Sequence, residues 1–333
     1  LNRGDGQPYG AGDPNNIIGP IWTFKSISAV PTILVHPKNA LALNGNASFS
    51  VTASVAATSY QWFKVSSPSD IQLTDDGKFS GTQTATLTIT GATVADEGLY
   101  YCIAYNNGIP SEPSNTAKLW YPRLVGYYPF DTLTDNTSPD VISGLNAVMM
   151  QAGNASLPGL NTADALIGTG CLQLSNPVAA SSDDQYAQIP AGVIDYEDLT
   201  ISLWVRPNNV FTWSRILDFG TGTTDYLFIT PNNGGNALRF AIRDDNGTEQ
   251  TLTGPAVPVG QWSHIAFTLT GSTGRLYYNG ELVATNTSMS FNPIDLAATM
   301  NYLGKSQYTA DPDFDGLIDD LKIYNYARST VEI

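Results

Sequence analysis

The sequence predicts an all-β protein with at least two domains. Hydrophobic residues make up 42% of the 333 residues and charged residues only 14%. Gly, Asn, Thr and Ser fill short gaps between the apolar runs, which is typical of β-sandwiches. The length also exceeds the roughly 250 residues at which a single core stops growing. No stretch of about 20 apolar residues is present, so we expect no membrane-spanning helix.

The chain is strongly acidic, and this negative charge limits the classes of molecule that it is expected to bind. Fifteen Lys and Arg face thirty Asp and Glu, which gives a net charge of −15. Such a field repels phosphate backbones and anionic lipid headgroups, so it argues against nucleic acid and membrane insertion. An acidic surface is compatible with the binding of neutral glycans, with the binding of calcium, or simply with solubility in a secreted protein. Because the chain starts at Leu1 without a charged and then apolar leader, we expect a mature or excised piece of a longer protein.

Residues 1–28 show no sustained periodicity. They are rich in Gly, Asn, Asp and Pro, and only residues 21–25 alternate like one short strand. Residues 19–24 (GPIWTF) resemble the closing strand of the fibronectin type III-like domains of large bacterial exoproteins. We therefore expect residues 1–28 to be the remnant of such a domain, or a linker.

Residues 29–121 have the strand spacing of a small sandwich, with an apolar run about every 8 to 12 residues. The predicted strands are residues 47–53, 59–64, 84–89, 98–105 and 116–120. Trp62 and the run from Asp96 to Cys102 resemble the strand C Trp and the tyrosine corner of I-set immunoglobulin domains. Val51 stands where that family has its first cysteine. Cys102 and Cys171 fall in different domains, so we predict two unpaired, buried thiols.

Residues 122–333 are too many for another immunoglobulin domain and suit a jelly roll of about twelve to fourteen strands. Five motifs occur in order: residues 127–131 (YYPFD), 199–207 (LTISLWVRP), 260–266 (GQWSHIA), 274–280 (GRLYYNG) and 314–325 (FDGLIDDLKIYN). Together they resemble the laminin G-like, concanavalin A-like jelly roll appended to bacterial glycoside hydrolases and surface proteins. The predicted fold is therefore an immunoglobulin-like sandwich followed by this jelly roll.

Catalysis is not expected, although this fold also hosts β-glucanases. Retaining glycosidases need two carboxylates about 5 Å apart, which in that fold come from a Glu-x-Asp-x-x-Glu strand. The glutamates after residue 124 are each isolated: Glu197, Glu249, Glu281 and Glu332. The only histidines, His36 and His264, fall in different domains, so no nucleophile and base pair is suggested.

Ligand binding is expected through aromatic side chains, because sugar rings stack on flat apolar faces. Trp213 lies in a predicted loop, and Tyr302 and Tyr308 lie in another, so we predict these three as ligand-binding residues. Strand alternation also places Trp262 and His264 on one face, and Trp204 with Ser202 on a face opposite the aliphatic side. This mixed face could bind a ligand, but we interpret it as structural because its positions recur in the family.

A structural calcium ion is also predicted. Alternation in the last strand puts Asp319 on the core face, where a carboxylate needs a partner or a metal. The resemblance implies calcium between the first and last strands, held by Asp131, Asp140, Asn146 and Asp319. The alternative for Asp319 is hydrogen bonding to backbone amides. Residues 311–316 (DPDFDG) copy the opening of an EF-hand loop and are a second candidate for calcium contact, but the copy is incomplete because Lys322 occupies its twelfth position.

These observations predict a non-catalytic, extracellular pair of modules from a larger secreted or cell-surface bacterial protein, binding polysaccharide or surface glycan. The alternative is a structural or adhesive block of a surface array or filament, which would bind itself or other surface proteins. Exposed aromatic residues lining a cleft would favour the first, and a large flat or strand-edge interface the second.

Overall fold

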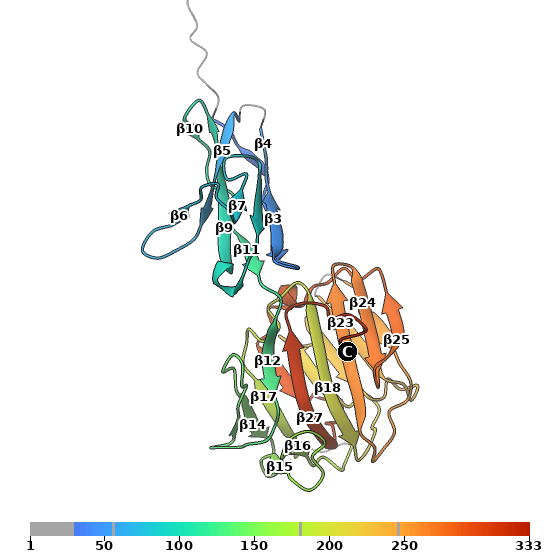
Figure 1. Cartoon of the computed structure of the whole chain (residues 1–333). Coiled ribbons are helices and arrows are strands. Elements are labelled where there is room, and N and C mark those ends of the chain that lie inside the picture. Colours follow the sequence, from blue (N-terminus) through green and yellow to red (C-terminus); the bar gives the residue numbers. More distant parts are fainter. Residues whose placement is uncertain (1–29, 55–56, 180–181, 245–246) are drawn as a thin grey trace, which may run out of the picture. The chain divides into compact units, whose positions relative to one another are not determined.

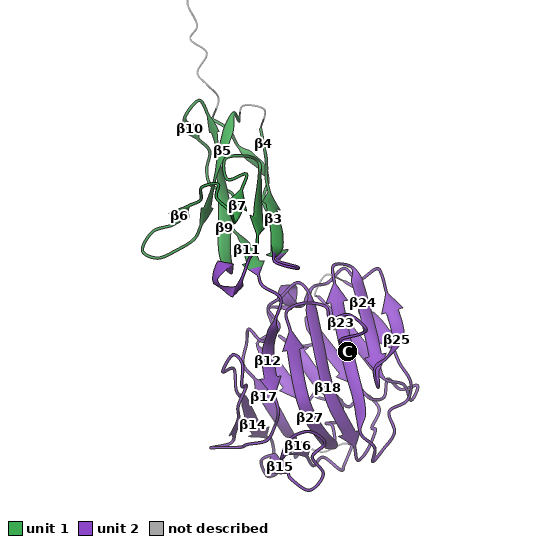
Figure 2. Cartoon of the chain, viewed as in Figure 1, with its two compact units in different colours: residues 1–40, 46–91, 98–119 green, residues 41–45, 92–97, 120–333 purple. Residues whose placement is uncertain are grey.

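The computed structural model describes residues 30–54, 57–179, 182–244 and 247–333. The described residues separate into two compact units, residues 30–40, 46–91 and 98–119 in one and residues 41–45, 92–97 and 120–333 in the other (Figure 2). Residues 1–28, which we expected to be a domain remnant or linker, lie outside the described part. No helix of the described residues is long and apolar enough to cross a membrane.

The N-terminal domain is a small sandwich. One sheet has the order β2-β11-β9-β5-β6 with β10 on β9, another has the order β3-β8-β7, and β1 pairs with β4. The strands are β1 (Ile33–Val35), β2 (Ala40–Leu41), β3 (Asn46–Ser50), β4 (Thr52–Ala53), β5 (Ser59–Lys64), β6 (Ile71–Gln72), β7 (Phe79–Ser80), β8 (Thr86–Thr90), β9 (Gly98–Asn106), β10 (Ile109–Pro110) and β11 (Ala117–Trp120). A single 3-10 turn, η1 (Val94–Asp96), precedes β9.

The core of this sandwich is held by packing. Phe49 of β3 reaches across to the other sheet, where its ring centre lies 5.2 Å from that of Tyr100 and 6.2 Å from that of Trp62. Val51 is buried at the predicted cysteine position. Cys102 and Cys171 are both free and buried, as predicted, and burial raises the pKa of each thiol to about 12.

The C-terminal jelly roll consists of two eight-stranded sheets, more strands than predicted. The front sheet has the order β15-β16-β27-β18-β23-β24-β25, with β12 also on β27 (Figure 1). Its strands are β12 (Leu124–Tyr128), β15 (Gly159–Asn161), β16 (Cys171–Leu174), β18 (Leu199–Pro207), β23 (Ser263–Thr270), β24 (Thr273–Tyr278), β25 (Glu281–Asn286) and β27 (Gly316–Tyr324).

The back sheet has the order β13-β14-β17-β26-β19-β20-β21-β22. Its strands are β13 (Thr137–Ser138), β14 (Ala147–Gln151), β17 (Gln185–Ile189), β19 (Leu217–Gly220), β20 (Tyr226–Thr230), β21 (Arg239–Arg243), β22 (Gln250–Thr253) and β26 (Met300–Leu303). The 3-10 turn η2 (Pro293–Leu296) precedes β26.

The apolar core of the jelly roll draws on both sheets. Ile201, Leu203 and Val205 of β18 point into it, and alternate residues of β23 do the same: Ile265, Phe267 and Leu269. The predicted faces of these two strands are therefore confirmed, and Trp204 and His264 lie on the outer face of the front sheet.

Strand β27 breaks its alternation, which corrects the predicted placement of Asp319. Ser202 pairs with Lys322 but Trp204 pairs with Asp319, so β27 carries one extra residue between these pairs. This β-bulge lies at Asp320, whose φ is 54°. Ile318 and Leu321 both reach the core, because the extra residue shifts the alternation. Asp319 and Asp320 consequently lie on the outer side.

Candidate functional site

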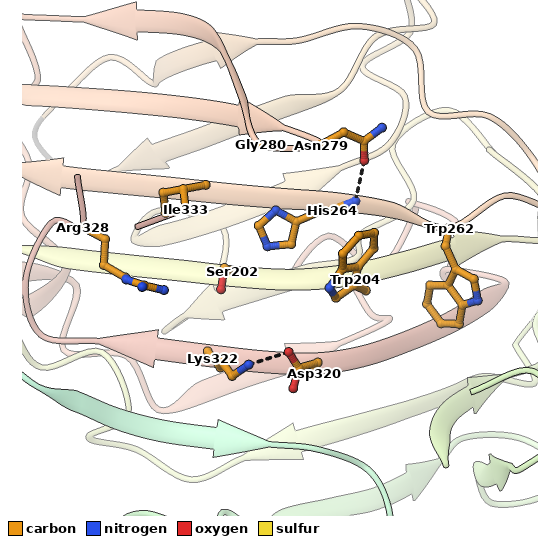
Figure 3. A pocket seen from close by; sticks show the side chains of 10 residues that line it. All are labelled: Ser202, Trp204, Trp262, His264, Asn279, Gly280, Asp320, Lys322, Arg328 and Ile333. Carbon is orange, nitrogen blue, oxygen red and sulfur yellow. Dashed lines mark hydrogen bonds and ion pairs between the residues drawn. The ribbon is translucent and has the colours of Figure 1, made fainter. Parts of the chain in front are cut away.

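A hollow of about 560 Å³ lies on the outer face of the front sheet (Figure 3). Strands β18, β23 and β27, the turn after β24 and the C-terminal segment supply its walls. The lining residues are Ser202, Trp204, Trp262, His264, Asn279, Gly280, Asp320, Lys322, Arg328 and Ile333. We call this hollow the front pocket.

An aromatic pair forms its floor. Trp204 and His264 stand directly opposite each other on β18 and β23, and their ring centres are 5.1 Å apart at an interplanar angle of 51°. Cross-strand aromatic neighbours of this kind hold each other's orientation. Both rings are only partly buried, as is Trp262. The Nε1–H of Trp262 donates to the carbonyl oxygen of Asp164 at 3.2 Å, which fixes the indole at the edge of the pocket.

The tight turn between β24 and β25 forms another wall. Asn279 and Gly280 have φ values of 49° and 82°, the left-handed pair that a two-residue hairpin requires. The turn is fastened to β23, since the Oδ1 of Asn279 accepts the N–H of His264 at 2.8 Å and the N–H of Asn279 donates to the His264 carbonyl at 2.8 Å. A rigid turn therefore holds a side-chain amide over the aromatic pair.

Asp320 provides the acidic group of the pocket. Its side chain is 8% exposed and its Oδ2 lies 2.6 Å from the Nζ of Lys322. Its Oδ1 is buried. Burial raises the pKa of Tyr127, and a hydrogen bond from the Tyr127 hydroxyl to the Asp320 carboxylate adds to that shift. A non-glycine residue in the left-handed region is strained, and such residues gather at ligand sites. The bulge thus places a carboxylate, paired with Lys322, in the wall of the pocket.

Lys322 and Arg328 supply charged donors, while Ser202, Asn279 and His264 can each donate and accept. Burial lowers the pKa of His264 from its usual range, so at neutral pH the ring has one donor and one acceptor nitrogen. Lys322 also lies 4.8 Å from the ring centre of Tyr127, and the guanidinium of Arg328 lies 4.6 Å from that of Tyr324. These rings hold the two cations in place.

This arrangement suits the binding of a polyhydroxylated ring. Partly exposed aromatic faces offer stacking, and fixed donors and acceptors around them recognise hydroxyl groups. Asp320 is the only acidic side chain that lines the front pocket. Glycoside hydrolysis requires a pair of carboxyl groups, so the lining favours binding over that reaction.

The mixed face that we interpreted as structural therefore lines an open pocket. Its aromatic residues were visible in the strand alternation, but nothing in the sequence showed whether loops cover this face. Loop 162–170 covers only the part of the front sheet near Asp319 and Trp262. The bulge at Asp320, which supplies the acceptor, left no recognisable signal in the sequence.

The four predicted calcium ligands are not brought together as one ligand set. Asp131 accepts the backbone N–H groups of Thr169 and Gly170 through one oxygen. The carboxylate of Asp140 accepts from the backbone and side chain of Ser143 and from other amides. The amide oxygen of Asn146 accepts the N–H of Asp140 at 3.0 Å. These donors engage one oxygen of Asp131, both oxygens of Asp140 and the amide oxygen of Asn146.

Asp319 also accepts backbone amides, which was the alternative considered for it. Its Oδ2 lies 2.9 Å from the nitrogens of both Leu166 and Ile167. Burial raises the pKa of Asp319, and these two hydrogen bonds act in the opposite direction. In the described part of the chain, no group of three His, Cys, Asp or Glu side chains is arranged to hold a metal ion. The residues present therefore do not fit the predicted calcium site.

The acidic loop at residues 311–316 sends its three carboxylates to different partners. Asp311 pairs with Arg215 at 2.8 Å, and Asp313 lies 3.7 Å from the Nζ of Lys305. Asp315 accepts from the side chain of Asn209. Carboxylates of a calcium loop converge on one point, and these do not.

The three predicted aromatic ligand residues all lie on the back sheet side of the jelly roll. Trp213 and Tyr308 lie in loops, as predicted, and both pack against a cluster of Tyr226, Phe228 and Ala241. Tyr302 lies in strand β26, which corrects its assignment to a loop. It alternates with the buried Asn301 and Leu303, so its ring lies on the outer face of the back sheet.

Comparisons with known proteins agree with this architecture. Residues 181–333 match the family model of the concanavalin A-like lectin/glucanases superfamily, and residues 30–106 match the immunoglobulin domain model. The chain therefore carries an immunoglobulin-like domain followed by a concanavalin A-like jelly roll, and the fold predicted from the sequence is confirmed.

Two curated proteins match short segments. Over 103 residues the chain is 28% identical to an α-L-arabinofuranosidase of Bifidobacterium longum. This match covers 31% of this chain and 9% of that enzyme. Over 144 residues it is 26% identical to the rat Sushi, von Willebrand factor type A, EGF and pentraxin domain-containing protein 1. This second match covers 40% of this chain and 4% of that protein. The chain thus spans less than a tenth of either relative.

One similar solved structure is domain 4 of AbnA, a GH43 extracellular arabinanase from Geobacillus stearothermophilus, in complex with arabinotriose. The TM-score is 0.51 at 22% identity, and the match covers 63% of this chain and 96% of that domain. At this identity the likeness shows the fold alone.

Proposed function

We propose that the chain is a non-catalytic, carbohydrate-binding part of a larger secreted or cell-surface protein, and that its jelly roll binds glycan in the front pocket. The observation that carries this proposal is the partly exposed Trp204–His264 pair in a pocket that the Asp320 carboxylate also lines. A stacking surface with an adjacent acceptor is what a sugar ring and its hydroxyl groups require.

The class of glycan follows from charge and from the similar proteins. A net charge of −15 disfavours polyanionic chains, so neutral polysaccharides are the proposed ligands. The similar arabinanase domain was solved with arabinotriose, and one relative is an arabinofuranosidase. Arabinan and its oligosaccharides are therefore the first ligands to test.

Binding is tested by screening the chain on immobilised arabinan, arabinoxylan, galactan and β-glucan, alongside Trp204→Ala. We expect retention on at least one glycan and loss of that retention in the variant. Leu282→Ala is the matched control, because Leu282 is an exposed apolar residue of the same sheet outside the pocket. Absence of retention on all four glycans, or equal retention of Trp204→Ala, would contradict the proposal.

The non-catalytic part has its own test. Purified protein incubated with the same four polysaccharides should release no reducing sugar, because the front pocket offers a single carboxyl side chain. Release that persists at equal specific activity through two different purifications would show an enzyme.

A further inference from the structure

The outer face of the back sheet carries a second aromatic hollow. Tyr226 and Phe228 project from β20 on this face with ring centres 5.6 Å apart. Tyr308 approaches from its loop with its ring 5.9 Å from that of Tyr226, at an interplanar angle of 72°. The space beside them measures about 210 Å³, and Trp213 completes its aromatic lining. We call this space the back pocket.

Trp213 is held in a strained backbone conformation at this pocket. Its φ is 66°, and its N–H donates to the carbonyl of Asn232 at 2.8 Å. The guanidinium groups of Arg239 and Arg215 lie 5.4 and 5.7 Å from its ring centre. The indole remains partly exposed. Strain at a bulky aromatic residue that is fixed but not fully covered is typical of a ligand-holding position.

Polar groups of both charges surround the aromatic rings. Arg215 is 3% exposed, lies 3.9 Å from the ring centre of Phe228 and pairs with Asp311 at 2.8 Å. Glu249 accepts from the hydroxyl of Tyr226 at 2.8 Å and lies 3.4 Å from Arg239. An ionised carboxylate has about four acceptor positions, so Glu249 and Asp311 retain capacity for further donors.

We infer that the back pocket is a second saccharide-binding site, which takes one ring of a neutral glycan. Its volume of about 210 Å³ is below the roughly 300–1,000 Å³ that encloses a larger ligand, so it suits a single ring stacked on Trp213 and Tyr308. The carboxylates and arginines of the site balance one another, which favours hydroxyl groups over a charged ligand. This inference deepens the proposed function, on which it rests for the class of ligand.

The two pockets lie on opposite outer faces, because the front and back sheets enclose one core between them. A short oligosaccharide therefore cannot occupy both. The jelly roll would hold two glycan chains, or two distant parts of one chain, and gain avidity on a polysaccharide surface.

Fluorine NMR of protein labelled with 5-fluorotryptophan separates the two sites. The chain has six tryptophans, and single Trp→Phe variants assign their signals. Trp204 and Trp262 report on the front pocket and Trp213 on the back pocket, while the buried Trp62 serves as an internal control. Arabinotriose, xylotriose and cellotriose are titrated as probes.

We expect at least one probe to shift the Trp213 signal, and to do so equally in Trp204→Ala protein. Glu249→Gln should weaken the response at Trp213 at least threefold and leave the response at Trp204 unchanged. Val148→Ala, an exposed back-sheet residue, should alter neither. Shifts confined to Trp204 and Trp262 would overturn the second site alone, whereas shifts confined to Trp213 would overturn the front pocket alone. If no probe moves the Trp213 signal, the second site is overturned.

Discussion

Asp319 holds a loop against the front sheet through its carboxylate. One of its oxygens accepts the N–H groups of Leu166 and Ile167, while Asp131 accepts those of Thr169 and Gly170 farther along the same loop. Loop 162–170 thereby connects the last strand of the jelly roll with the chain that follows its first strand. This is the link that we had predicted calcium to make.

Replacing Asp319 tests this link at the level of one side chain. Asp319→Ala leaves two amides without an acceptor, at a cost of about 1–3 kcal/mol each, so the free energy of unfolding should fall by roughly 2–6 kcal/mol in urea denaturation. Asp319→Asn retains one acceptor oxygen and should lose less. A chelator should leave the unfolding midpoint of the unmodified protein unchanged. A lower midpoint in chelator would restore the calcium site.

Asp218 makes the stability of the jelly roll depend on pH. Burial raises its pKa to about 7, despite Arg215 nearby, whereas an unfolded Asp titrates near 3.9. Between these values the folded state binds more protons than the unfolded state, so stability should fall as pH rises from about 4 to 7. Asp218→Asn should reduce that decline, as measured by thermal unfolding across this range, and the rest comes from Asp313, whose pKa burial also raises to about 7. An unchanged profile in the variant would show that Asp218 is ionised throughout.

Strand β27 shows what a single inserted residue does to a strand. The bulge at Asp320 turns two consecutive carboxylates to the outer side of the sheet, where one fastens a loop and the other lines the front pocket. Strict alternation would have sent Asp319 into the apolar core. Asp320 thus lines the pocket because the strand is irregular.

Asp320→Gly separates the binding role of this residue from its structural role. Glycine adopts positive φ without strain, and Lys322, which is 29% exposed, can turn toward water. Thermal stability should therefore be unchanged or slightly raised, while retention on the immobilised polysaccharides falls. Reduced stability together with unchanged retention would show that Asp320 serves the fold and not the ligand.

Regular strands could be read from the sequence, and irregular ones could not. Strands β18 and β23 alternate without interruption, so the outward position of Trp204 and His264 followed directly. The partners of Asp131 and Asp319 are backbone amides of a distant loop, and amides carry no residue-specific signal. Tyr302 was assigned to a loop because its strand has only four residues. Tertiary pairing with β17 and β19 forms that strand.

At the scale of the molecule, the chain joins two all-β domains, an immunoglobulin-like sandwich and a jelly roll. The immunoglobulin-like core was predictable because Trp62, Tyr100 and Cys102 stand at fixed spacings. The jelly roll was predictable from motifs distributed over its whole length. Its pockets were not, because each one gathers residues from several strands and loops, and one sequence does not show which of these meet.

The most direct test of the central claim is a crystal structure of the chain with the oligosaccharide that it retains best. We predict a sugar ring against Trp204 in the front pocket, with a hydroxyl about 2.5–3.0 Å from the Oδ2 of Asp320, the oxygen that also accepts from Lys322. An oligosaccharide bound elsewhere on the chain, with the front pocket free of sugar, would contradict the account.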